Sequence, residues 1–225
     1  SLNSAIEAGH IKKPDSNNPL TIVDLGCGHA YLTFAAHQYL KSQGVAVKVV
    51  GIDVRESARV RNNEIAKKLG IAGSIEFRAE EISETTLKQA DISIALHACD
   101  TATDDALAWS VKADAKLVLV APCCHHDIQA QMVEVPEPWS MITKNGIMKE
   151  RLGDLITDGL RIQIMKLSGY RVEAIEFIGG EHTPRNLMIR AVKTGAVADP
   201  LEEKRYQEML SLWKVKPALA ALLNR

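Results

Sequence analysis

Apolar runs alternate along the chain with amphipathic stretches, which is the pattern of alternating strands and helices. Five short runs rich in β-branched residues predict strands, at 21–26, 47–54, 74–80, 91–98 and 116–122. Apolar residues at helical spacing predict helices between them, at about 30–43, 56–70 and 101–113, the last with Thr101 or Thr103 placed to cap it. A longer helix is predicted at 146–170, followed by strands at 171–178 and 186–193 and by a helical tail that Pro217 interrupts.

Strands that alternate with helices form a parallel sheet covered on both faces, whereas two strands joined only by a loop form a hairpin. We therefore expect an α/β fold with a doubly wound, Rossmann-like sheet of seven strands whose last strand is antiparallel. This arrangement resembles class I S-adenosylmethionine (SAM) methyltransferases, since dinucleotide dehydrogenases usually carry a sixth parallel strand. Residues 21–193 are expected to form this domain, 1–20 the end of an upstream region, and 194–225 a C-terminal helical extension.

The amino-acid composition and net charge exclude several classes of protein. The chain has 225 residues, of which 46% are hydrophobic and 24% charged, as in ordinary globular proteins. Its net charge of −1 gives no overall basic field, so any binding to nucleic acid needs a local patch. No apolar run approaches the roughly 20 residues that span a bilayer, and no secretory signal is seen. Four cysteines in a domain of this size do not indicate a disulfide scaffold. We expect a cytoplasmic protein without a membrane partner.

The segment VDLGCGHA (23–30) is a candidate cofactor turn between the first strand and the first helix. Glycines allow a tight turn and close approach of a ligand to the free N–H groups of the helix start. A dinucleotide fingerprint would place a further glycine at Tyr31. The acidic residue before the turn instead matches the methyltransferase pattern D-x-G-x-G. The residues expected at the cofactor are Asp24, Gly26, Cys27 and Gly28.

Acidic residues also end the next two strands. Asp53, followed by Val54, ends the second strand, where a carboxylate can accept both ribose hydroxyls of a nucleoside. Glu80 or Glu81 ends the third strand and is expected near adenine, and His97 after the fourth strand is expected beside the cofactor. Acids at three successive strand ends favour ligand binding over the alternative of helix caps or solvated loop residues.

Cysteines and histidines gather at the same sheet edge, above all in PCCHH (122–126) after the fifth strand. Ligands of open α/β sheets bind beyond the carboxyl ends of the strands, so this run faces the expected methyl acceptor. The predicted acceptor-site residues are Asp100, Cys123, Cys124, His125 and His126.

Three chemical roles and one purely structural role are considered for these residues. An aspartate or histidine at these strand ends can act as a general base, the candidates being Asp100, Asp104, His97, His125 and His126. Cys123 or Cys124 can attack a pyrimidine ring, given a base that forms the thiolate. Zinc binding is disfavoured because adjacent C-C and H-H pairs lack the usual ligand spacing, so no metal site is predicted. A cysteine at a strand end is often simply a small buried hydrophobe.

The blocks HACDTATDDAL (97–107) and APCCHH (121–126) are similar to segments of the eukaryotic tRNA acceptor-stem 2′-O-methyltransferase group. NGIMKERLGDLITDGLR (145–161) and EHTPRNLMIRAV (181–192) resemble bacterial class I methyltransferases of unassigned substrate. The resemblance covers roughly Thr21 to Lys193 and implies SAM as cofactor and RNA, either tRNA or rRNA, as substrate and partner. Asp100 stands where the tRNA enzyme's motif has glycine, and that enzyme's zinc-finger-like segments are absent.

Weaker features lie outside these blocks. The long helix region has basic residues interleaved with acids, which favours a solvated face: Lys144, Lys149, Arg151, Arg161 and Lys166. Trp139 can stack on a base or anchor its loop, and His182 and Arg185 lie in a loop at the ligand edge. The sequence thus predicts an RNA methyltransferase. Two alternatives remain: a methyltransferase that acts on a small molecule or a protein, and a non-catalytic binding module with the SAM fold.

Overall fold

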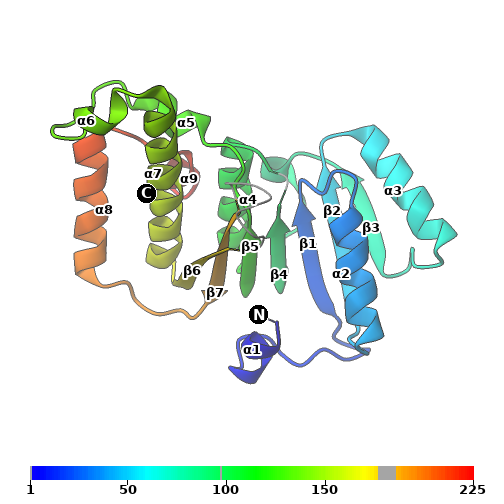
Figure 1. Cartoon of the computed structure of the whole chain (residues 1–225). Coiled ribbons are helices and arrows are strands. Elements are labelled where there is room, and N and C mark those ends of the chain that lie inside the picture. Colours follow the sequence, from blue (N-terminus) through cyan, green and yellow to red (C-terminus); the bar gives the residue numbers. More distant parts are fainter. Residues whose placement is uncertain (1, 97, 177–185) are drawn as a thin grey trace.

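A computed structural model describes residues 2–96, 98–176 and 186–225. Its centre is a seven-stranded sheet in the order β3-β2-β1-β4-β5-β7-β6, in which β7 runs antiparallel to both of its neighbours (Figure 1). The predicted doubly wound α/β fold with an antiparallel last strand is therefore confirmed. The strands are β1 (Leu20–Leu25), β2 (Val47–Asp53), β3 (Ile75–Ala79), β4 (Ile92–Ala95), β5 (Leu117–Val120), β6 (Tyr170–Glu176) and β7 (Leu187–Lys193).

Helices follow the strands as the hydrophobic pattern predicts. The helices of the described residues are α1 (Leu2–Glu7), α2 (Tyr31–Ser42), α3 (Glu56–Lys68), the 3₁₀ turn η1 (Ile82–Glu84), α4 (Thr101–Lys112), α5 (His126–Gln131), α6 (Ser140–Thr143), α7 (Gly146–Leu167), α8 (Pro200–Trp213) and α9 (Ala218–Leu222). Each of the predicted helices ends within three residues of its expected bounds. The short helix α5, which begins inside the PCCHH run, was not predicted. None of the helices among the described residues is long and apolar enough to cross a membrane.

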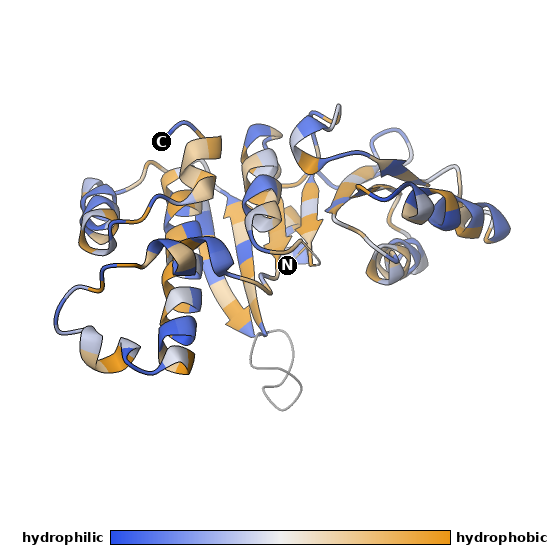
Figure 2. Ribbon diagram, turned by 90° about the horizontal axis from the view of Figure 1, so that it is seen from above, coloured by the Kyte–Doolittle hydropathy of each residue, from blue (hydrophilic) through white to orange (hydrophobic). Residues whose placement is uncertain are grey.

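Two hydrophobic cores cover the two faces of the sheet. Successive side chains of a strand point to opposite faces, so Leu20 and Ile22 of β1 pack with α1, α2 and α3, whereas Val23 and Leu25 pack with α4, α7, α8 and α9. In Figure 2 the central strands are coloured hydrophobic, while polar colours dominate the outer surfaces of the helices. Both faces of the central parallel strands are thus buried, as such strands require, whereas most residues of the edge strand β6 are exposed or half-buried.

The C-terminal helices complete the second core. Trp213 of α8 and Leu219 of α9 are buried, and α9 packs against α4 while α8 packs against α7. The apolar stripe of the tail therefore packs within the chain, over the helical layer of the domain. Asp199 caps α8, since its side chain accepts a hydrogen bond from the Leu201 N–H at 2.9 Å.

The start of α4 differs from its prediction. Neither Thr101 nor Thr103 caps the helix by its side chain, because the Thr103 hydroxyl donates to the Ala98 carbonyl at 2.7 Å. Asp100 occupies the N-cap position with φ +52° and ψ −121°. L-residues rarely adopt this conformation and glycine adopts it readily.

Candidate functional site

A cavity opens at the carboxyl ends of β1, β2 and β4, where the strand order reverses between β1 and β4. Open α/β sheets bind their ligands at this point. The cavity is lined by Gly26, Gly28, Asp53, Val54, Arg55, Glu80, Ile82, Ala98, Cys99 and Ala102. Of the residues predicted to bind the cofactor, the structure therefore brings five into one lining, namely Gly26, Gly28, Asp53, Val54 and Glu80.

The turn after β1 shapes the floor of this cavity. Gly26 and Gly28 have φ values of +78° and +56°, which favour glycine over other residues. A Cβ on Gly26 would lie 3.5 Å from the Ala98 backbone, which is an ordinary van der Waals contact, so the positive φ and not a lack of space favours glycine here. The Asn62 amide of α3 donates to the Gly28 carbonyl at 3.0 Å and fixes the turn from the far side.

Asp24 and Cys27, both predicted to bind the cofactor, lie behind the lining instead. The buried Asp24 carboxylate accepts a hydrogen bond from the Thr33 hydroxyl at 2.5 Å, which ties β1 to α2. Cys27 is 3% exposed and packs beside Gly51, and burial raises the pKa of its thiol to about 12. Both residues therefore hold the turn in place from the core side.

Asp53 is held at the mouth of the cavity by several donors. Its Oδ2 accepts from the Gly28 N–H at 2.9 Å, and its Oδ1 accepts from the Arg55 side-chain Nε at 2.8 Å and from the Arg55 backbone N–H at 3.0 Å. Burial opposes ionisation of the carboxyl, but the hydrogen bonds from Arg55 and Gly28 outweigh it and lower the pKa of Asp53. The group is therefore a preorganised carboxylate, suited to accept hydroxyl hydrogens.

Sequence reasoning missed Arg55, which lines the cavity and pairs with Asp53. Its side chain is more than half exposed, although its guanidinium holds the Asp53 carboxylate. A strand-end acid followed by a basic residue two positions on (D-x-R) is the local signal that would have suggested this pairing.

The structure decides between the two acids after β3. Glu80 lines the cavity, whereas Glu81 is exposed and lies outside the lining. The Glu80 Oε1 atom is buried and accepts no hydrogen bond from the described residues. Its nearest cation, Arg78, is 3.8 Å away. A buried acceptor without a donor is costly, so the cavity fits a ligand that donates a hydrogen bond here. Apolar Val54 and Ile82 beside it suit a flat base such as adenine.

Thiols gather on the acceptor side of the cavity. The Sγ atom of Cys99, which lines the cavity, lies 3.2 Å from the Cys123 Sγ, and the Cys123 Sγ lies 3.6 Å from the Cys124 Sγ. Burial first, and then the neighbouring Cys99 and Cys124, raise the pKa of Cys123 to about 12. Cys123 is therefore a neutral thiol at neutral pH, which disfavours its action as a nucleophile without a further activating group.

Asp100 lies between Cys99 and Ala102 in the sequence; these two residues line the cavity, but Asp100 is not part of the lining. Its Oδ1 accepts a hydrogen bond from the Asp127 N–H at 3.2 Å, which ties the loop after β4 to the start of α5. The two predicted histidines lie elsewhere. His126 is exposed and lines a separate hollow with Gln129, Lys149 and other residues of α5 and α7.

His125 is buried in a charged network that joins the loops to α7. Its Nε2 lies 2.9 Å from Asp158 Oδ1 and its Nδ1 lies 3.2 Å from Asp154 Oδ1. With 3% of its surface exposed, this imidazole is out of reach of an acceptor in the cavity. The geometry favours a positioning role for His125 over proton transfer.

Arg161 is the centre of this network. Its guanidinium forms two hydrogen bonds with the Asp104 carboxylate, at 3.0 and 2.7 Å, one with Asp158 at 3.3 Å, and one with the Asp100 carbonyl at 2.9 Å. Burial disfavours the guanidinium charge, but these carboxylates outweigh it and raise the pKa of Arg161. The prediction that Arg161 lies on a solvated helix face is therefore wrong, since it is 2% exposed. Asp104, a candidate base, is held in the same buried pair.

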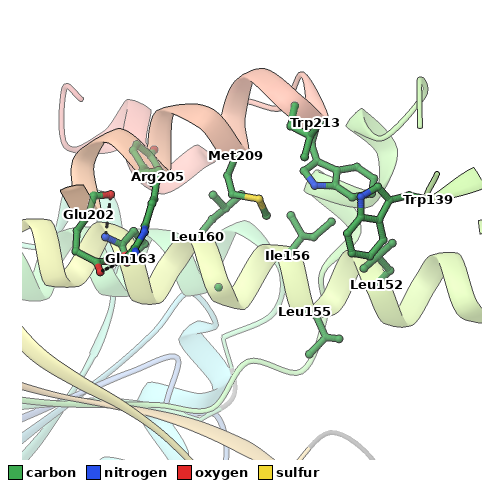
Figure 3. Close-up of a pocket in the computed structure, with 13 residues that line it drawn as sticks. Trp139, Leu152, Leu155, Ile156, Leu160, Gln163, Glu202, Arg205, Met209 and Trp213 are labelled. Carbon is green, nitrogen blue, oxygen red and sulfur yellow. Dashed lines mark hydrogen bonds and ion pairs between the residues drawn. The ribbon is translucent and has the colours of Figure 1, made fainter. Parts of the chain in front are cut away.

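Trp139 is not part of the lining of this cavity. It lies in a separate apolar groove between α7 and α8 (Figure 3). Its ring centroid is 5.7 Å from that of Trp213, with the planes tilted by 58°. The contact favours the anchoring role for Trp139 over base stacking. His97, His182 and Arg185 lie outside the described residues.

A family model described as a methyltransferase domain matches residues 2–131, which is more than half of the chain. The chain belongs to this methyltransferase-domain family. No curated protein matches it.

Solved structures share the fold of this methyltransferase domain. A geranyl diphosphate methyltransferase in complex with SAM is 14% identical, with a TM-score of 0.52 over 86% of this chain and 85% of the other. The geranyl diphosphate C-methyltransferase of Streptomyces coelicolor A3(2) is 12% identical, with a TM-score of 0.52 over 86% and 80%. Magnesium protoporphyrin IX methyltransferase of Synechocystis PCC 6803, with bound SAH, is 14% identical, with a TM-score of 0.50 over 86% and 80%.

Proposed function

We propose that this methyltransferase domain transfers the methyl group of S-adenosyl-L-methionine to RNA, either tRNA or rRNA, in the cytoplasm. The observation that carries the cofactor assignment is the cavity at the strand-order reversal. There the ionised Asp53 and the buried Glu80 oxygen offer acceptors beside a turn of glycines. A nucleoside has the matching donors, in its two ribose hydroxyls and its exocyclic amine.

In methyl transfer the bond between carbon and the sulfonium sulfur breaks, its electron pair stays on sulfur, and a new bond forms between the methyl carbon and the acceptor. Positioning supplies most of the acceleration in such an in-line displacement. The cofactor cavity fixes the donor, and Asp100, which follows the lining residue Cys99 in the sequence, is our candidate for the base that takes the acceptor's proton.

The surroundings of Cys123 favour direct transfer over covalent catalysis by this residue. A covalent mechanism needs a base that forms the thiolate, but the side chains at 3.2 and 3.6 Å from the Cys123 Sγ are the thiols of Cys99 and Cys124, neither of which is such a base. His125, the nearest histidine in sequence, is engaged by Asp158. Cys123→Ala is therefore expected to retain methyl transfer.

RNA as the acceptor rests on the resemblance of HACDTATDDAL and APCCHH to the tRNA methyltransferase group. An open acceptor side agrees with a large substrate, since Cys99 is exposed at the cavity edge. The small-molecule and protein alternatives, and the non-catalytic binding module, become outcomes of the experiment below.

The test follows tritiated methyl groups from SAM into RNA, protein and small-molecule fractions from cells that lack the gene, with Asp53→Ala as the blank. Label in RNA that the Asp53→Ala variant does not produce supports the proposal. Label only in protein or in small molecules refutes RNA as substrate. No label, from a protein that binds SAM, favours the binding module.

A further inference from the structure

We propose that Cys99, Cys123 and Cys124 form a binding site for a thiophilic metal ion, with Zn²⁺ as the physiological type. Among the described residues these three side chains form a group whose ligand atoms all lie within 4.8 Å of one another. The site is independent of the proposed methyl transfer, because it rests on the sulfur positions alone.

The distances suit a single ion. Zinc–sulfur bonds are about 2.3 Å long, so two sulfurs of a tetrahedral zinc site lie about 3.8 Å apart. The Cys99–Cys123 and Cys123–Cys124 sulfur distances are 3.2 and 3.6 Å. Shifts of a few tenths of an ångström in these two pairs bring the sulfurs to coordination spacing, which rotations about the side-chain bonds can supply.

The spacing of these cysteines along the sequence does not predict a metal site. Cys123 and Cys124 are adjacent and give no C-x₂₋₄-C signal, while Cys99 precedes them by more than twenty residues. The sheet joins them, because β4 and β5 are neighbouring parallel strands and the three cysteines follow the ends of these two strands. Residues from separate strand ends thus converge in a way that no local motif records.

The backbone that carries the thiols is fixed on both sides. The Ala98 carbonyl, next to Cys99, accepts from the Thr103 hydroxyl, and the Ala121 N–H donates to the Ala95 carbonyl at 3.0 Å, linking the two strand ends. The Asp100 carboxylate holds the start of α5, just after Cys124. A preorganised set of ligands loses little freedom when an ion binds.

The donor set selects the kind of metal. Thiolates are soft ligands that favour zinc and copper(I) over magnesium or calcium. Three protein ligands leave the fourth position of a tetrahedral ion open, as in catalytic rather than structural zinc sites. Cys99 is exposed and lines the cofactor cavity, so the ion would lie at the cavity edge with solvent access.

The test is titration of the reduced, metal-stripped full chain with Co²⁺ under anaerobic conditions, with Zn²⁺ as the displacing ion. We expect one Co²⁺ per chain, with a sulfur-to-cobalt charge-transfer band and the visible bands of a tetrahedral site, both removed by Zn²⁺. Loss of even an outer-shell partner costs metal sites 10–100-fold in affinity, so Cys99→Ser, Cys123→Ser and Cys124→Ser should each weaken binding at least about 100-fold.

Cys27→Ala is the matched control, because it removes a cysteine that lies in the core outside the cluster. It should retain the full charge-transfer band, and circular dichroism checks that every variant is folded. Absence of the band in folded, reduced wild-type protein overturns the proposal without any variant. An undiminished band in the three serine variants overturns it equally.

Discussion

Replacement of Arg161 by methionine tests whether the buried charged network holds the acceptor side together. Methionine keeps much of the volume but removes the cation that Asp104 and Asp158 share. Asp104 is 5% exposed, so the variant leaves a buried carboxylate without its guanidinium. Removing one partner of a buried ion pair costs about 3–5 kcal/mol. In a domain of this size that corresponds to a fall of about 6–20 °C in Tm.

Urea unfolding followed by circular dichroism measures the change in the free energy of unfolding. Adding Asp104→Asn to Arg161→Met removes the unpaired charge and should recover part of the loss, because the penalty belongs to the stranded carboxylate. Lys204→Met is the control, since Lys204 and Glu208 form an exposed pair at 3.8 Å that is worth under about 1 kcal/mol. A loss below 1 kcal/mol for Arg161→Met, or no recovery in the double variant, would refute the reasoning.

Three further predictions concern single residues of the site. The pKa of Asp53 is lowered in the folded state, so the carboxylate stabilises the fold fully above about pH 4 and this contribution is lost as the pH falls through the folded-state pKa. The unfolding free energies of wild type and Asp53→Asn should therefore converge in acid. A difference between them that grows in acid contradicts the lowered pKa. Gly28→Ala forces alanine to φ +56° and should cost about 1–2 kcal/mol in urea unfolding, so an unchanged stability would exclude strain at this turn. Asp100→Gly relieves φ +52° but removes the hydrogen bond from the Asp127 N–H, so the two effects should nearly cancel and change stability by less than about 1 kcal/mol. The same variant should slow methyl transfer, and an unchanged rate of transfer excludes Asp100 as the base.

Most of the fold follows from the hydrophobic pattern. Alternate residues of β1 point into different cores, and loop-joined β6 and β7 pair as the predicted hairpin. The glycine turn and Asp53 were also predictable, because tight turns and strand-end acids are local features. The spacing of residues along the chain is enough to predict a feature whose residues are neighbours both in sequence and in space.

The remaining features depend on partners that are distant in sequence. Arg161 resembles any basic helix residue until Asp104, on α4, is seen to face it. His125 resembles a site histidine until Asp158 of α7 is found against its ring. Cys99 meets Cys123 only because β4 and β5 lie side by side. Burial and pairing of polar side chains are tertiary properties, and no periodicity in the sequence encodes them.

Calorimetric titration of the folded chain with SAM, and with its demethylated product, tests the central claim most directly. The account predicts one binding site per chain, weakened about 10–100-fold by Asp53→Asn, which removes a charge-assisted acceptor worth about 1.5–3 kcal/mol. Glu80→Gln should weaken binding as well, whereas Glu81→Gln, one residue away and outside the cavity lining, should leave it unchanged. No binding to the folded wild-type chain, or equal effects of the two glutamate variants, would contradict the assignment of this cavity to the methyl donor.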